Sequence, residues 1–67
     1  MISARNKFQG TIKAMNVDQV MAELVISVGD MEIVSLISRT SARKMELKLG
    51  DQVTAIIKST EVMIEKK

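Results

Sequence analysis

The stretch Gln19–Ser38, QVMAELVISVGDMEIVSLIS, decides the fold of this 67-residue chain. Apolar residues, many of them β-branched, recur at every second position on both sides of Gly29-Asp30, which is the period of a β-strand. Glycine adopts positive φ at little steric cost and aspartate tolerates turn geometry, so Gly29-Asp30 predicts a tight turn. We therefore expect a β-hairpin with strands over Gln19–Val28 and Met31–Ser38.

Neither face of this hairpin is cleanly polar. One face of its first strand carries Val20, Ala22, Leu24, Ile26 and Val28, whereas the other carries Met21 and Val25. A chain this short buries only about 60% of its unfolded surface, and 46% apolar residues are generous for so small an interior. The sequence has no Cys and no His to supplement the core through disulfides or a structural metal. We therefore expect another subunit to cover the second face.

Further elements flank the hairpin. The segment Lys7–Met15 alternates in the same way and predicts an earlier strand, with Phe8, Gly10, Ile12 and Ala14 inward. Thr40–Leu47 breaks the alternation and predicts a short helix, Gln52–Lys58 predicts a fourth strand, and Val62–Ile64 predicts a short fifth strand. These elements predict an all-β fold, an OB-like five-stranded Greek-key barrel with one short helix. An SH3-like barrel and a strand-exchanged dimer are the alternative architectures.

Composition narrows the functional classes. No proline or low-complexity stretch divides the chain, so we expect residues 1–67 to form a single domain. The net charge of +2 is too small to indicate a nucleic-acid partner by itself. The N-terminus does not resemble a signal peptide and no run reaches the roughly 20 apolar residues of a membrane span. We expect a cytoplasmic protein without a membrane partner.

The inventory of side chains disfavours catalysis. Without His, Cys or Tyr, a general base at neutral pH would require a Lys or carboxylate with a strongly shifted pKa. The acidic residues are scattered without the spacing of a cation site. We therefore expect neither an enzyme nor a metal-cation site.

Two clusters of hydrogen-bond donors stand out from the apolar strands, Ser3–Asn6 before the first strand and Lys58–Thr60 after the fourth. Arg and Lys supply charged donors, and Ser and Thr supply hydroxyls. A third group, Ser38–Ser41, precedes a helix, whose N-terminus favours negative charge. Together they fit an oxyanion. Each also has a plain structural interpretation, as a solvated terminus, a turn and a helix cap.

The chain resembles the Mop, or molbindin, family in motifs spread over its length. In chain order these are SARN at Ser3–Asn6, Gly10, the Ile37–Ser41 segment, Leu47 to Gly50-Asp51, and KSTEVM at Lys58–Met63. SARN and KSTEVM are specific as a pair at this separation. The length resembles that of the solitary molbindins rather than that of longer regulators and transporter ATPases that carry the unit as an appended domain.

The resemblance implies a homohexamer, a trimer of dimers, that binds molybdate or tungstate at subunit interfaces and serves in storage and homeostasis of the oxyanion. It assigns the anion contacts of one subunit to Ser3, Arg5, Lys58 and Ser59, with Thr60 as a candidate neighbour. From the adjoining subunit it assigns Ser38, Ser41 and the backbone around Ala42. Ser38 stands where relatives often carry Thr, which preserves the hydroxyl.

Two other functions remain open at this point. An OB-fold nucleic-acid-binding module would need exposed aromatic rings on which bases stack, and Phe8 is the single aromatic residue in the sequence. A structural or regulatory module would instead recruit a protein through an exposed strand edge. It predicts no effect of oxyanions on thermal stability.

Overall fold

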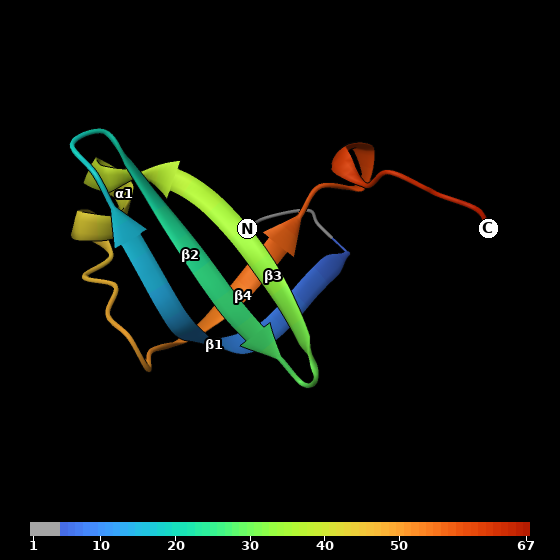
Figure 1. The fold of residues 1–67 in the computed structure, drawn as a ribbon, viewed down its shortest axis with the longest axis horizontal. Helices are drawn as coiled ribbons and strands as arrows, with labels where there is room; N and C mark the ends of the chain where they lie inside the picture. Colours follow the sequence, from blue (N-terminus) through green and yellow to red (C-terminus); the bar gives the residue numbers. More distant parts are fainter. Residues whose placement is uncertain (1–4) are drawn as a thin grey trace.

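Within residues 5–67, which the computed structural model describes, the chain forms four strands, one α-helix and one turn of 3-10 helix (Figure 1). In chain order these are β1 (Asn6–Val17), β2 (Met21–Val28), β3 (Met31–Ser38), α1 (Arg39–Lys44), β4 (Gln52–Ile57) and η1 (Ser59–Glu61). The predicted hairpin is confirmed, with β2 and β3 as its strands. The predicted helix is also present but shorter than expected, because it ends at Lys44 rather than Leu47.

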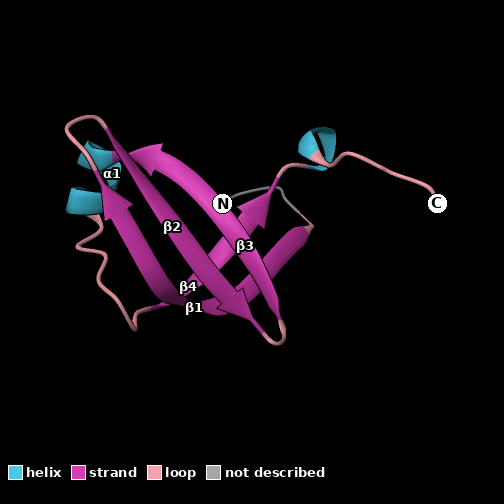
Figure 2. Ribbon diagram, viewed as in Figure 1, coloured by secondary structure: helices cyan, strands magenta, loops and turns pink. Residues whose placement is uncertain are grey.

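All four strands join one antiparallel sheet in the order β3-β2-β1-β4 (Figure 2). Three consecutive strands joined by hairpin turns, with a fourth that returns to lie beside the first, form a Greek key. The first half of β1 pairs with β4, and its second half pairs with β2. This change of partner curls the sheet, and α1 packs against β2 and β3. The all-β, OB-like fold with one short helix is confirmed.

The expected fifth strand is wrong. Val62–Ile64 follows η1 in a tail that pairs with no strand of the described chain (Figure 1). A strand requires a partner whose backbone groups it can bond, and three apolar residues in a row do not supply one. The described sheet therefore has four strands, with β3 and β4 as its edges.

The core is formed by one face of β2 together with single residues of β1 and α1. The buried side chains are Ile12, Ala22, Leu24, Ile26 and Ala42. Alternate residues of a strand point to one side of the sheet, so the buried residues of β2 occupy the face that the sequence pattern predicted. Ala42 of α1 is buried together with these residues of β2, so the contact between helix and sheet determines the position of the helix.

β1 departs from regular alternation at Lys13. Ile12 pairs with Ile26 and Ala14 pairs with Val25, so Lys13 is the extra residue of a β-bulge. The bulge reverses the alternation beyond it: Ala14 is exposed and Met15 is half-buried. The expectation that Ala14 points inward is wrong. The sequence alternates regularly up to Ala14, but the extra residue Lys13 shifts the facing of the later side chains by one position.

The start of α1 is tied to the turn between β1 and β2. The Arg39 N–H donates to the Val20 carbonyl oxygen at 2.7 Å. Within this turn, the Asp18 carboxylate accepts the backbone N–H groups of Met21, at 2.7 Å, and Val20, at 2.8 Å. These two hydrogen bonds hold the pKa of Asp18 below its usual value, with a smaller contribution from the charge of Arg39. Asp18 thus holds the turn together, and the turn is hydrogen-bonded to the first residue of the helix.

α1 ends in a Schellman motif that places Glu46 in the left-handed region, at φ 53°. The Leu47 N–H donates to the Ala42 carbonyl at 3.1 Å, and the Glu46 N–H donates to the Arg43 carbonyl at 3.0 Å. Glycine usually occupies this position, because a Cβ atom makes the left-handed conformation unfavourable. Glu46 therefore carries backbone strain.

We expect Glu46→Gly to stabilise the fold by roughly 0.5–1 kcal/mol, because the relief of left-handed strain exceeds the added entropy of the unfolded chain. Urea denaturation at fixed protein concentration measures the change. The control is Arg43→Gly, which places glycine inside α1 and should destabilise the fold by about 1 kcal/mol. Equal losses in both variants would contradict the assignment of strain to Glu46.

Candidate functional site

The register of β1 and β4 brings Arg5 beside Lys58. Asn6 pairs with Ile57 and Lys7 pairs with Ile56, so Arg5 directly precedes, and Lys58 directly follows, the last residue pair of this ladder. Arg5 and Lys58 are both exposed. The two cations that the sequence places 53 positions apart are thus neighbours at one end of the sheet.

Ser59 and Thr60 follow Lys58 directly and lie in η1, where both are exposed. Lys58 is the residue that caps this turn, and its carbonyl oxygen accepts the Glu61 N–H at 2.9 Å. The turn holds the two hydroxyl-bearing residues next to the Arg5–Lys58 pair. Ser3, the remaining predicted member of this cluster, lies outside the described residues.

The second predicted cluster lies at the start of α1. Ser38 is the N-cap, and its Oγ accepts the Ser41 N–H at 3.0 Å. The Ser38 hydroxyl in turn donates to Ser41 Oγ at 2.8 Å, which leaves the proton of the Ser41 hydroxyl available to an external acceptor. Ser41 is exposed, and the side chain of Ala42 is buried beneath the helix. The plain interpretation of Ser38 as a helix cap is therefore correct and compatible with ligand binding.

One chain does not bring the two clusters together. The end of β4 and the start of β1 lie at one end of the molecule, and α1 lies at the other (Figure 1). Arg5 therefore lies at the same end of the sheet as the segment of Lys58, Ser59 and Thr60, whereas Ser38, Ser41 and Ala42 lie together at the start of α1. A ligand that contacts both clusters requires a second copy of the chain.

Lys7 is a third cation on the same face, which the sequence analysis did not single out. It lies two positions after Arg5 in the chain, pairs with Ile56 of β4, and is exposed. The recurrence of cations at every second position of a strand is the signal that could have identified it. Between described residues, the one salt bridge joins Lys13 to Glu32, so none involves these three cations.

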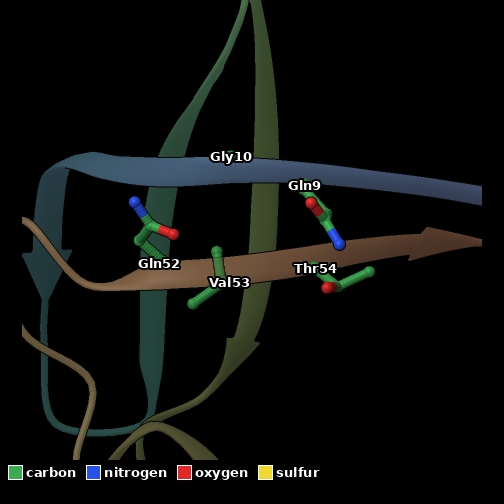
Figure 3. Close-up of a pocket in the computed structure, with 5 residues that line it drawn as sticks. All are labelled: Gln9, Gly10, Gln52, Val53 and Thr54. Carbon is green, nitrogen blue, oxygen red and sulfur yellow. The ribbon is translucent and has the colours of Figure 1, made fainter.

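The same face of β1 and β4 continues into a polar hollow of about 220 Å³ (Figure 3). Its lining residues are Gln9, Gly10, Gln52, Val53 and Thr54. None of these side chains is charged, and none was predicted as a site residue. Nor do residues 5–67 contain a group of three or more Asp, Glu, His or Cys side chains that could hold a metal ion. The positive charge on this face is therefore not offset by carboxylates lining the hollow.

Comparison with known proteins agrees with the motifs. The sequence model of the TOBE domain matches residues 2–64. Molybdenum-pterin-binding protein 3 of Clostridium pasteurianum is 42% identical over 64 residues, which cover 94% of each chain. The chain belongs to the TOBE-domain family and, within it, to the Mop (molbindin) proteins. The Clostridium pasteurianum relatives are named for binding a molybdenum-pterin compound.

Solved structures extend the similarity to the fold of this Mop domain. A molybdate-binding protein from Sporomusa ovata superposes with a TM-score of 0.93 at 38% identity, over 98% of both chains. ModG, described as a cytoplasmic molybdate-binding protein and solved with molybdate bound, superposes with a TM-score of 0.83 at 37% identity. That match covers 87% of the present chain and 42% of ModG. No α-helix within residues 5–67 has the length and apolar character needed to cross a membrane.

Proposed function

We propose that this Mop domain binds molybdate or tungstate between subunits of a cytoplasmic homohexamer, for storage and homeostasis of the anion, and that it catalyses no reaction. The observation that supports this proposal is the pairing of Asn6 with Ile57, which brings the neighbouring Arg5 and Lys58 to one end of the sheet, next in the chain to Ser59 and Thr60 in η1. The relatives named as molybdate-binding proteins support the choice of anion.

The chemistry of the cluster suits a tetrahedral dianion. Molybdate and tungstate carry no proton at neutral pH, so a shell made only of donors can satisfy every oxygen. Arg5 offers a planar fork of N–H groups and Lys58 offers a mobile ammonium, which together offset the two negative charges. Phosphate retains a proton much of the time, and a shell without an acceptor leaves that proton unpaired at a cost of about 1–3 kcal/mol. Sulfate has no such proton, so its exclusion depends on the size of the cavity.

The remainder of the proposed shell comes from two sources. Ser3 joins Arg5, Lys58 and Ser59 on one subunit, as in the family motif. Ser38, Ser41 and the backbone at Ala42 are supplied by the adjoining subunit, where the Ser41 hydroxyl has a proton to donate. Because such an anion contacts two subunits, its binding stabilises the assembly by mass action.

Exposed apolar residues support the oligomer. On the sheet face opposite the core, Val34 is 62% exposed and Leu36 is 63% exposed, and both lie on the edge strand β3. An edge strand with apolar side chains exposed to water favours association. The alternative of a nucleic-acid-binding module gains no such support, because the ring of Phe8 is only partly exposed and no other aromatic residue is present.

Isothermal titration calorimetry with molybdate, tungstate, sulfate and phosphate tests the proposed function. We expect tight binding of molybdate and tungstate, and binding of sulfate and phosphate that is weaker by at least tenfold. A ligand-to-chain ratio is read from the same titration. If none of the four anions binds at millimolar concentration, the proposal is wrong, and a titration with single-stranded oligonucleotides then tests the nucleic-acid alternative.

A further inference from the structure

Lys7 is an exposed cation that forms no salt bridge with any described residue. The one salt bridge within residues 5–67 joins Lys13 to Glu32. The cross-strand partner of Lys7 is the apolar Ile56 of β4. The proposed anion shell does not use Lys7 either, so its charge is free to act on an ion bound nearby.

Lys7 lies near both cations of the proposed anion site. Two residues of extended chain span at most about 7 Å, which limits the distance between the Cα atoms of Lys7 and Arg5. Lys58 lies two residues after Ile56, the cross-strand partner of Lys7. Cα atoms of paired residues are about 4.5–5.5 Å apart, so those of Lys7 and Lys58 are at most about 13 Å apart.

The sheet surface around Lys7 carries no acidic side chain that offsets its charge. Exposed residues alternate along β1 and β4, and those that follow the alternation of Lys7 and its partner are Gln9, Gln52, Thr54 and Ile56. Three of these uncharged residues also line the polar hollow of Figure 3. The acidic residue nearest to Lys58 in the chain is Glu61 of η1, which sets one negative charge against three positive ones. This end of the sheet therefore favours an anion more strongly than the net charge of +2 for the whole chain suggests.

We propose that Lys7 strengthens the binding of a tetrahedral dianion through its electric field, from outside the shell of residues that contact the anion. The inference rests on the proposed function, because the dianion of that proposal is the ion on which Lys7 acts. A unit charge about 10 Å from a dianion in water changes the binding constant roughly two- to threefold at low ionic strength. In 1 M salt the field is screened within about 3 Å, so the contribution of Lys7 disappears, whereas the contacts made by Arg5 and Lys58 persist.

Calorimetric titration of the full-length protein with molybdate, at ionic strengths of about 10 mM and about 1 M, tests this role. At the low ionic strength we expect Lys7→Gln to weaken binding about two- to threefold and Lys7→Glu about five- to tenfold. Both variants should match the parent at the high ionic strength. Lys7→Arg keeps the charge and should match the parent at both. Lys13→Gln is the matched control, because it removes one positive charge roughly 20 Å further along the strand and should weaken binding less than Lys7→Gln does.

Three results would overturn the role of Lys7. Parental affinity of Lys7→Gln at low ionic strength means that its charge does not act on the anion. An equal loss at both ionic strengths means that Lys7 contacts the anion directly, and a loss in Lys7→Arg means that the shape of the side chain matters and not its charge. The same titrations separate this inference from the proposed function. If the parent binds molybdate and Lys7→Gln binds it equally well, only the role of Lys7 is wrong, whereas a parent that binds no molybdate shows that the proposed function is wrong.

Discussion

Gly10→Ala is expected to destabilise the fold by about 3 kcal/mol or more, since overpacking typically costs about 1–3 kcal/mol and more when backbone must move. A Cβ atom on Gly10 would lie 2.4 Å from the carbonyl oxygen of Ser27 and 2.8 Å from side-chain carbons of Ile26 and Val28. The carbonyl belongs to the backbone of β2 and cannot rotate away as a flexible side chain would. A chain of this length has a total stability of roughly 3–10 kcal/mol, so the variant should be largely unfolded or severely weakened.

Urea denaturation followed by circular dichroism measures this loss, at one protein concentration for every variant. Gly29→Ala is the matched control, because Gly29 has a positive φ of 60° and no heavy atom within 4 Å of its ideal Cβ position. The control should lose only about 1–2 kcal/mol from left-handed strain. If Gly10→Ala loses no more than Gly29→Ala, the close approach of β1 to β2 does not require glycine.

Arg5→Ala and Lys58→Ala are each expected to weaken molybdate binding by roughly 10–100-fold, because a hydrogen bond to a charged group contributes about 1.5–3 kcal/mol and each 1.4 kcal/mol is tenfold. At a molybdate concentration of about 100 times the parent's Kd, binding stabilises the parent by about 2.7 kcal/mol. A 100-fold weaker variant gains only about 0.4 kcal/mol at that concentration. For a small domain, the rise in Tm should fall from roughly 10–20 °C to roughly 2–3 °C.

The two variants should not weaken the protein without molybdate. Arg5 and Lys58 carry the same charge and lie next to the last residue pair of the β1–β4 ladder, so removing either cation should leave the Tm of the free protein unchanged or slightly higher. Arg5→Lys keeps the charge and loses the planar fork, and should show intermediate affinity. Lys48→Ala, in the loop before β4, controls for the loss of one positive charge. Parental affinity in both alanine variants would show that the anion binds elsewhere.

Comparing the Tm of each variant with and without molybdate distinguishes residues that bind the anion from residues that stabilise the fold. A residue that holds the fold together loses stability in both states when it is replaced. Arg5 and Lys58, exposed and without an ion pair to any described residue, should instead matter only when the anion is present. The measurement therefore tests the role of the cluster and not only its importance.

Residue patterns along the chain predicted most of the secondary-structure elements. The hairpin of β2 and β3 follows from alternation around Gly29-Asp30, and the buried face of β2 follows from the same period. The preference of Ser and Thr for the cap position left Ser38, Thr40 and Ser41 as candidates, and the structure places the cap at Ser38. The bulge at Lys13 could not be predicted in this way, because it depends on how β1 is paired and not on its composition.

Residue patterns alone predicted the candidate site as residue types, and its arrangement was expected only from the resemblance to the family. The segments that contain Arg5 and Lys58 are recognisable from their donors and from the family motif, and the sequence alone determined the alternating strands, the turns and these donor segments. The tertiary structure decided that β1 pairs with β4 so that Arg5 and Lys58 lie at the same end of the sheet, that α1 lies at the far end, and that Val62–Ile64 pairs with no described strand. Alternation, turns and caps depend on neighbouring residues, whereas strand register depends on pairing between segments far apart in the chain. For that reason only the folded chain shows which donors meet.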